Sequence, residues 1–512
     1  MRSILLVVSL FLLLGSLTDD LLVFAQQKVD SPVFKHPPLP QPPMLKTSDV
    51  LEDIWQTFLL SRKANAGDPL AQYELGVRYM IGKGIEADSG KAAYWFSKAA
   101  AQNMLSARFN LGILSFNGWG VSWNPFEAFK AFRISAEGDL PEAEYIVGLF
   151  YAENMVVPLD YGKSLSWVRK AAAGGDKNAK DALPDLERAA ALWHERRAAG
   201  IDSLHQVPLV PVASGDTAGM TRAGTLLHSA LLGADPDMRR ALGLARLLDT
   251  DLQVDTVGLN ALRAAADVGS PEALALIGRC EEQGVAVVHD DVAALASYVR
   301  ATRMGSPRAS ELLLAMLQKP GVLQELKTKA RHDDPEAQFA WSALHALGFE
   351  SILMREQALM TPAQAVQQLK KAADRGYVPA LIELGLWYFS GRWVAADEAR
   401  AAELWERAAH LGSREAGLRL AAVRLREERD SAATAEDLAT VNRGMEDGSV
   451  LAEVALGYCR EMGRGVPVNV AEAVRLYRVA ARRGSLDAYR ALRRLHDLLR
   501  PPDPEFVIRE EE

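Results

Sequence analysis

Small and hydrophobic residues return along this chain at a fixed interval of 36 positions. The step leads from Ala71 to Ala107, Ala143 and Ala179, and later from Ala273 to Ala309 and from Ala380 to Ala416, Ala452 and Ala488. Such a period is typical of repeat proteins, in which each unit is one supersecondary element that buries its apolar face against its neighbours. The pattern therefore predicts an array of similar units.

Each unit is expected to begin with an amphipathic helix, whose positions we count from the first alanine as position 0. Positions 0, 4 and 8 share one helix face, and in the first unit they hold Ala71, Leu75 and Tyr79. Because glycine costs about 1 kcal/mol relative to alanine inside a helix, a glycine that recurs at position 5 indicates close helix contact. These glycines are Gly76, Gly112, Gly148, Gly278, Gly385 and Gly457.

A second helix is expected to complete each unit. A glycine at position 11 predicts the end of the first helix, and Asp or Asn at position 17 predicts the N-cap of the second. Position 25 carries a bulky anchor, so each unit is expected to be a packed helix hairpin. The turn glycines are Gly82, Gly118, Gly284, Gly391 and Gly463; the caps are Asp88, Asn124, Asp160, Asp290, Asp397 and Asn469; the anchors are Phe96, Phe132, Val168, Tyr298, Trp405 and Tyr477.

The combined pattern, A-x3-L-G-x2-Y, a G-x-G turn, Asp or Asn, A-x2-W and a terminal K-A-A, resembles the Sel1-like repeat, a relative of the tetratricopeptide repeat. The likeness covers most of residues 64–499. It implies an all-α fold, an α-solenoid of helix-turn-helix repeats wound into a right-handed superhelix. Some units depart from the pattern, since Asn154 and Val156 replace turn glycines and Pro184 stands where a helix glycine belongs.

The N-terminal segments predict export. Residues 1–25 have a single basic residue, an apolar run and a small-residue site before Gln26, as a secretory signal peptide does. An uncleaved anchor is the alternative interpretation. Residues 26–47 are rich in proline and are expected to form an extended linker.

The rest of the chain divides into two expected arrays. Residues 48–200 would form an N-terminal helical cap and the first array, and the apolar side of the cap helix, which includes Trp55 and Phe58, is expected to cover the first repeat. Residues 201–216 form a proline-containing linker, residues 217–499 a second array, and residues 500–512 an acidic tail that we expect to be loosely ordered. The apolar side of the cap consists of Leu51, Ile54, Trp55, Phe58 and Leu59.

Composition and charge narrow the possible functions. The chain has 512 residues, of which 49% are hydrophobic and 24% charged, and this suits one long solenoid. Its net charge of -8 disfavours a general nucleic-acid binder. The two cysteines, Cys280 and Cys459, are five repeat lengths apart, so we expect buried thiols and no disulfide between them.

No catalytic or metal-binding constellation emerges from the sequence. The nine histidines are scattered, and His194 with Glu195 lacks the second histidine of a metalloprotease helix. The glycines lie in helix turns and not in a nucleotide-binding loop. We therefore expect a protein that is not an enzyme and that has no cofactor and no metal.

Two sets of residues are candidates for partner binding. Tyr73, Phe109 and Tyr145 hold position 2 of neighbouring units, which points away from the side expected to be buried, so they would form an aromatic stripe for a peptide or for sugar rings. The alternative is ordinary packing between helices. The last units are rich in arginine, with only Asp487 and Asp497 to offset it. This end would either bind an acidic partner, anionic lipid headgroups or an anionic polymer, or form a solvated end cap. The candidates in this second set are Arg482, Arg483, Arg490 and Arg494.

Together these features predict an exported adaptor or assembly scaffold without enzymatic activity. Its protein partners would bind the concave face, with no integral membrane span after signal cleavage. The signal-like segment predicts a periplasmic or secreted protein. In a eukaryote, the resemblance implies an adaptor in the endoplasmic reticulum lumen. The alternative function is that of a periplasmic carbohydrate-binding protein for exopolysaccharide or peptidoglycan, with a glycan as its ligand.

Overall fold

The computed structural model describes residues 47–198, 248, 252–347, 349, 360–427 and 431–508. These residues form α-helices and one short 3-10 helix, with no β-strand among them, as the predicted all-α fold requires. Contacts divide the chain into two compact units, the first made of residues 1–191, 222–235 and 496–512 and the second of residues 192–221 and 236–495. The predicted signal peptide, the proline-rich linker up to residue 46 and the linker at 201–216 lie outside the described residues.

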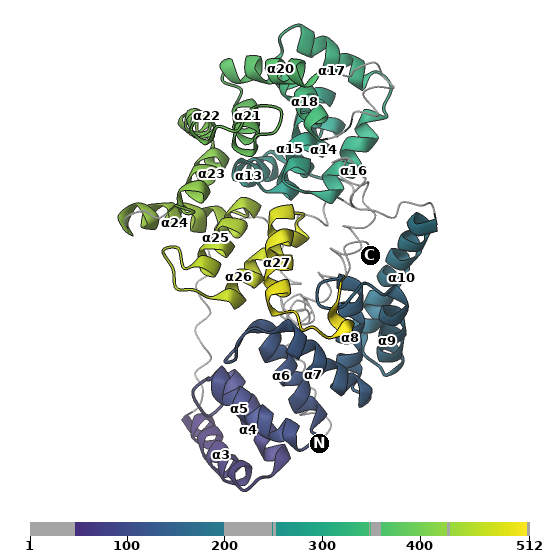
Figure 1. Cartoon of the computed structure of the whole chain (residues 1–512), viewed down its shortest axis with the longest axis vertical. Coiled ribbons are helices and arrows are strands. Elements are labelled where there is room, and N and C mark those ends of the chain that lie inside the picture. The colour runs from purple at the N-terminus through teal and green to yellow at the C-terminus, as the bar shows by residue number, and fades with distance from the viewer. Residues whose placement is uncertain are drawn as a thin grey trace. The chain divides into compact units, whose positions relative to one another are not determined.

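The first unit is a row of helices in which each of α3 to α8 packs on the next (Figure 1). Its helices are α3 (Thr47–Asn65), α4 (Pro69–Ile81), α5 (Ser89–Ala101), α6 (Leu105–Asn117), α7 (Pro125–Glu137), α8 (Pro141–Glu153), α9 (Tyr161–Ala173) and α10 (Lys177–Ala198), the last residues of which, from Leu192 onward, are counted with the second unit. The unit that begins at Ala179 forms one long helix, α10, and Pro184 lies inside it.

The second unit repeats the same hairpin arrangement. Its helices are α13 (Thr256–Asp267), α14 (Pro271–Gln283), α15 (Asp291–Arg303), α16 (Pro307–Leu317), α17 (Val322–Arg331), α18 (Pro335–Ala346), α20 (Pro362–Asp374), α21 (Val378–Ser390), α22 (Glu398–His410), α23 (Arg414–Arg424), α24 (Ser431–Glu446), α25 (Val450–Met462), α26 (Val470–Arg482) and α27 (Leu486–Leu499). Residues from His496 onward belong to the first unit, and they include the 3-10 helix Pro504–Phe506.

The helix boundaries follow the residues that predicted them. All five predicted turn glycines adopt left-handed backbone angles directly after a first helix, for example Gly82 at φ 69° and Gly463 at φ 71°. All six predicted N-cap side chains accept hydrogen bonds from the first turn of a second helix, as Asp88 does from the backbone N–H of Lys91. In the unit that lacks the turn glycines, Asn154 takes the left-handed position at φ 53°.

The glycine at position 5 lies directly beneath the anchor at position 25 of the same hairpin. A methyl group on Gly112 would come within 2.7 Å of the Phe132 ring, and one on Gly457 within 2.7 Å of the Tyr477 ring. The same pairing is found in the other four units, between Gly76 and Phe96, Gly148 and Val168, Gly278 and Tyr298, and Gly385 and Trp405. This confirms that the recurring glycines allow close contact between the two helices of a unit.

Helices of the second unit that are distant in sequence also meet. The turn after α15 contacts the turn after α26, where Gly305 and Gly484 pack backbone against backbone and leave no room for a side chain on either. Val268, at the end of α13, lies in one apolar cluster with Leu418 of α23 and Cys459 of α25. The start and the end of this unit therefore pack together, which contacts between successive repeats alone would not predict.

Candidate interaction surfaces

The predicted aromatic stripe is not a surface feature. Tyr73, Phe109 and Tyr145 expose 5%, 1% and 2% of their area, so the expectation that they face away from the buried side is wrong. Position 2 instead faces the anchor of the same hairpin. The ring centroids of Tyr73 and Phe96 are 5.7 Å apart, and those of Phe109 and Phe132 are 5.3 Å apart. Packing between helices, the alternative interpretation, describes all three residues.

The predicted basic end is neutralised by carboxylates from other repeats. Arg483 is buried and donates to Glu272 at 2.8 and 3.0 Å and to Glu453 at 2.5 Å, so it holds α14, α25 and the end of α26 together. Burial opposes the charged form of this guanidinium, but the two carboxylates prevail and raise its pKa. Arg483 is a structural residue in a buried ion cluster and is inaccessible to a partner in this structure.

The other three candidate arginines lie closer to solvent. Arg494 binds Glu461 at 2.6 Å, and the exposed Arg490 is 3.7 Å from Asp487. Arg482 is half-buried. The expectation that only two aspartates offset this end is wrong, because folding brings glutamates of α14 and α25 to it. Whether Arg482, Arg490 and Arg494 bind a partner stays a prediction.

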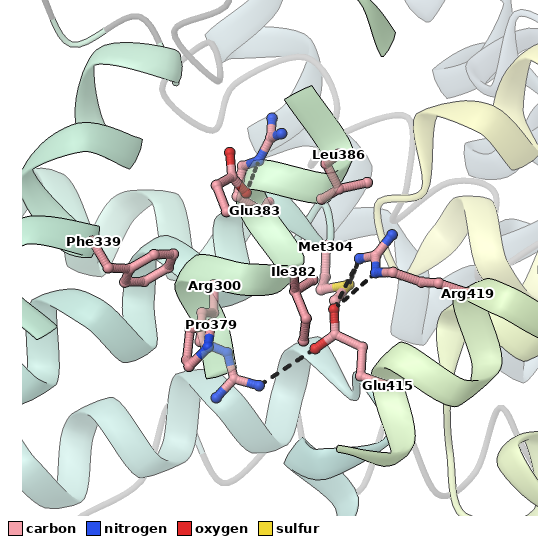
Figure 2. Close-up of a pocket in the computed structure, with 10 residues that line it drawn as sticks. Arg300, Met304, Phe339, Pro379, Ile382, Glu383, Leu386, Glu415 and Arg419 are labelled. Carbon is pink, nitrogen blue, oxygen red and sulfur yellow. Dashed lines mark hydrogen bonds and ion pairs between the residues drawn. The ribbon is translucent and has the colours of Figure 1, made fainter. Parts of the chain in front are cut away.

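A small pocket lies in the second unit between α15, α18, α21 and α23 (Figure 2). Its apolar wall includes Phe339 and Ile382, which hold position 2 of their units, and Leu386, one turn further along α21. Three arginines border this wall. The lining residues are Arg300, Arg303, Met304, Phe339, Pro379, Ile382, Glu383, Leu386, Glu415 and Arg419.

Two buried carboxylates hold the arginines of this pocket in place. Glu415 accepts from Arg419 at 2.9 and 3.1 Å and from Arg300 at 3.4 Å. Glu383 accepts from Arg303 at 3.1 Å. Figure 2 shows these ion pairs at the edge of the apolar wall. Among the lining residues there are three guanidinium groups and two carboxylates, and Arg300 and Arg303 remain 25% and 23% exposed.

The size of the pocket limits what it can hold. The cavity volume of the pocket is only about 20 Å³, which is room for about one water molecule. Small-molecule sites are usually several hundred Å³ in volume. The pocket is therefore a dimple in a mixed apolar and cationic surface, suited to a protruding side chain of a larger partner.

The second unit also holds two buried thiols and one partly buried carboxyl group whose pKa is shifted. Cys280 and Cys459 are free and fully buried, which confirms their prediction as core residues, and burial raises the pKa of Cys459 to about 11. Glu281 accepts from Ser297 at 2.7 Å, and burial raises the pKa of its carboxyl to about 7.

The cap helix α3 covers the first repeat with the face opposite to the one predicted. Thr57, Leu60 and Ala64 are buried, and Leu60 and Ala64 share a cluster with residues of α4. The apolar side that was expected to pack inward is exposed instead. Ile54, Trp55, Phe58 and Leu59 expose 49%, 56%, 51% and 41% of their area.

Residues 500–508, here called the C-terminal strap, pack on α7 and on the turn after α8. Phe506 is fully buried, with its ring centroid 5.3 Å from that of Phe126. Arg500 donates to the backbone carbonyls of Met155 and Val156, each at 3.1 Å, and Glu505 pairs with Arg133. The expectation of a loosely ordered tail is therefore wrong for these residues, because an aromatic anchor and two polar side chains fix them.

Within the described part of the chain, no group of three His, Cys, Asp or Glu side chains is placed to hold a metal ion. In the same residues, every helix is too short or too polar to cross a lipid bilayer.

Comparison with known proteins supports the interpretation of the repeats. The family model described as the Sel1 repeat matches residues 69–104, 105–140, 141–176, 378–413 and 450–485. These segments correspond to the hairpins α4–α5, α6–α7, α8–α9, α21–α22 and α25–α26.

Two curated proteins are similar in sequence. An ERAD-associated E3 ubiquitin-protein ligase component of Arabidopsis thaliana is 32% identical over 105 residues, which are 20% of this chain and only 16% of that protein. An uncharacterised protein of Neisseria meningitidis serogroup B is 24% identical over 390 residues, covering 66% of this chain and 79% of the relative.

Two solved structures are also similar. One is a protective antigen of uropathogenic Escherichia coli strains with an SLR fold, at 22% identity and a TM-score of 0.27 over 83% of this chain and 79% of that one. The other is a Sel1 repeat protein from Oxalobacter formigenes, at 18% identity and a TM-score of 0.22 over 71% of this chain and 97% of that one. The chain therefore contains five Sel1 repeats, and each folds as a helix hairpin whose two helices meet closely at a glycine.

Proposed function

We propose that this chain is an exported, non-enzymatic scaffold that binds protein partners through its helical repeats. The signal-like pattern of residues 1–25 supports export, to the periplasm or the extracellular space in a bacterium. The Arabidopsis relative is, by its name, a component of a ligase assembly, which is consistent with a role in holding proteins together.

The observation that carries the proposal is the pocket surface of the second unit. Arginine, methionine and aromatic side chains are enriched at the centres of protein–protein interfaces. Here Arg300, Arg303 and Arg419 are held by buried glutamates beside an apolar wall, so their positions are set before a partner arrives. Such preorganisation lowers the entropic cost of binding. A partner with an acidic residue next to a protruding apolar side chain fits this surface.

The proposal is tested by affinity capture from an envelope or lumen extract, with a variant that places a negative charge on the apolar wall. Leu386→Glu is expected to abolish recovery of the partner, because a carboxylate there would be desolvated on binding and would repel an acidic ligand. Leu386 is only half-buried, so the melting temperature should change little. Ala435→Glu adds the same charge at an exposed position of α24 and is expected to retain the partner. Equal recovery by both variants would contradict the proposal for this surface.

The carbohydrate-binding alternative has lost its supporting observation, since the aromatic rings that were to stack on sugars are buried. It would regain support if the chain bound purified peptidoglycan or exopolysaccharide and Leu386→Glu left that binding unchanged.

The proposed location has a separate test. Cell fractionation is expected to place the chain in the envelope or lumen fraction with an N-terminus at Gln26, and a chain that keeps Met1 there would instead favour the uncleaved anchor.

A further inference from the structure

The first described helix is half of a repeat unit. Counted from residue 35, Leu60 holds the anchor position 25, Ala64 holds position 29, and Gly67 holds position 32 with φ 98°, as Gly175 does with φ 101° in a complete unit. Leu60 and Ala64 pack on Ala71 and Leu75 of α4. Helix α3 therefore occupies the place of a second helix, at the outer edge of the first unit (Figure 1).

The outward side of α3 differs from that of every matched repeat. Position 20 is charged in all five units that match the family model, and position 23 is polar or charged in four of them and a tyrosine in the fifth. In α3 these positions hold Trp55 and Phe58, which are 56% and 51% exposed. The residues at position 20 are Lys91, Glu127, Lys163, Arg400 and Glu472, and those at position 23 are Tyr94, Lys130, Ser166, Glu403 and Arg475.

An apolar outer face is unusual at the end of a repeat array, where terminal units normally present a polar surface for solubility. Trp55 and Phe58 stack on each other with ring centroids 5.6 Å apart, and Ile54 and Leu59 extend the same face. A contiguous exposed apolar patch of this kind marks a site of association.

Charges at the two ends of α3 indicate which partner fits. Glu52 is exposed near the start of the helix, and Arg62 and Lys63 are exposed in its last turn. If two copies of α3 pack antiparallel about a two-fold axis level with Thr57, the partner subunit's Arg62 lies opposite Glu52 and the partner subunit's Leu59 lies opposite Trp55. The face is therefore complementary to itself in both apolar contact and charge, as an isologous interface requires.

We propose that the outer face of α3 is a self-association surface, through which two copies of this chain pair antiparallel. Trp55, Phe58 and Leu59 supply the apolar centre, and two pairs of Glu52 with Arg62 and Lys63 set the orientation. One helix from each chain buries less surface than a standard stable interface, so the pairing is weak and depends on protein concentration.

The test is sedimentation velocity on the full chain between about 5 and 200 μM, a range chosen to bracket a weak dimer. The wild-type chain is expected to shift from monomer to dimer across the range. Phe58→Glu is expected to stay monomeric throughout with an unchanged melting temperature, since its side chain is half exposed. Tyr94→Glu is the matched control at position 23 of α5, where the ring is 53% exposed, and should dimerise like the wild type.

Charge reversal tests the antiparallel arrangement. Glu52→Lys alone is expected to weaken the dimer at least tenfold, and Glu52→Lys combined with Arg62→Glu and Lys63→Glu is expected to restore it. A triple variant as weak as the single one would overturn the antiparallel pairing.

Two further results would overturn the proposal as a whole. One is a chain that stays monomeric at every concentration, which would leave its own residues 1–46 as the occupant of the face. The other is a monomer that binds phosphatidylglycerol vesicles through the same side chains, with binding lost in Phe58→Glu, which would make the face a lipid-binding surface.

Discussion

At the scale of single residues, the glycine at position 5 is required by the side chain that lies over it. Gly457→Ala is expected to destabilise the second unit, because the new methyl group would lie 2.7 Å from the buried Tyr477 ring. Overpacking of this kind costs about 1–3 kcal/mol, more than the roughly 1 kcal/mol that alanine contributes to helix propensity.

Another glycine of the second compact unit, in a different repeat from Gly457, provides the control. Gly417 lies inside α23, where an added methyl group would meet no atom of a neighbouring element within 4 Å, so Gly417→Ala is expected to stabilise the protein by about 0.5–1 kcal/mol. Urea denaturation of both variants measures the two effects. If both substitutions stabilised the chain, the packing explanation of the repeated glycine would be contradicted.

The repeat pattern in the sequence was sufficient to predict the structural roles of residues whose contacts lie within one helix hairpin. The caps, the turn glycines and the buried cysteines all lie where the repeat pattern placed them. The prediction that side chains at position 2 point outward was wrong, because they pack against the bulky anchor at position 25. Phe109, for example, packs against Phe132. The recurrence of bulky anchors at position 25 was the signal that could have shown this.

At the scale of helices, the buried ion cluster around Arg483 holds distant repeats of the second unit together. Arg483→Met is expected to destabilise the unit by about 3–5 kcal/mol, because Glu272 and Glu453 would remain buried without their counter-charge. Arg490→Met is expected to change stability by less than about 1 kcal/mol, since its pair with Asp487 is exposed. Thermal unfolding of the two variants distinguishes a structural arginine from a surface one, and equal losses would contradict this assignment.

The carboxyl group of Glu281, between α14 and α15, makes the stability of the second unit depend on pH. Burial raises the pKa of Glu281 from 4.5 in the unfolded chain to about 7. The folded state therefore binds more protons than the unfolded state between these values, so stability falls as pH rises from about 4.5 to 7 and stays reduced above 7.

Replacing the Glu281 carboxyl with a neutral group should reduce the pH dependence of the protein's stability. Glu281→Gln keeps an acceptor for Ser297 and is expected to raise the melting temperature at pH 8 while changing it little at pH 4.5. Glu403→Gln, at an exposed position of α22, is expected to do neither. Scanning calorimetry at both pH values provides the comparison, and a rise at pH 4.5 as large as that at pH 8 would exclude titration of Glu281 as the cause.

The helices themselves were largely predictable, but the contacts between distant helices were not. Arg483 was grouped with its sequence neighbours as a basic end, whereas its partners come from α14 and α25. Likewise, the apolar side of α3 was assigned to the core, although the repeat register of Leu60 and Ala64 selects the opposite side for burial. Hydrophobicity alone cannot show which side of a terminal helix meets the array.

At the scale of the whole molecule, residues near the end of the chain complete the fold of its first repeats. Phe506→Ala is expected to release the C-terminal strap and expose the face of α7 that holds Phe126 and Phe129. Loss of a buried phenylalanine costs up to about 3–5 kcal/mol where the site cannot relax. Hydrogen exchange should therefore accelerate in α7 and α8 and remain unchanged in α21. Val507→Ala, at an exposed neighbouring position, is the control.

If α7 and α8 stayed protected in Phe506→Ala, the strap would be dispensable for the first unit. The strap had one visible signal in the sequence, the absence of turn glycines at Asn154 and Val156. In this turn, which lacks the usual glycines, the backbone carbonyls of Met155 and Val156 accept hydrogen bonds from Arg500. Nothing in the local pattern could connect two segments so far apart in the chain.

The central claim is that this repeat protein binds other proteins through a defined surface of its second unit. The most direct measurement is site-specific photocrosslinking in the living cell, with a benzophenone amino acid at position 386 on the pocket wall and at position 435 on α24. We expect a discrete protein adduct from position 386 that is absent from position 435 and is lost when Arg303 and Arg419 are both changed to glutamate. Identical adducts from both positions, or none from position 386, would contradict the central claim.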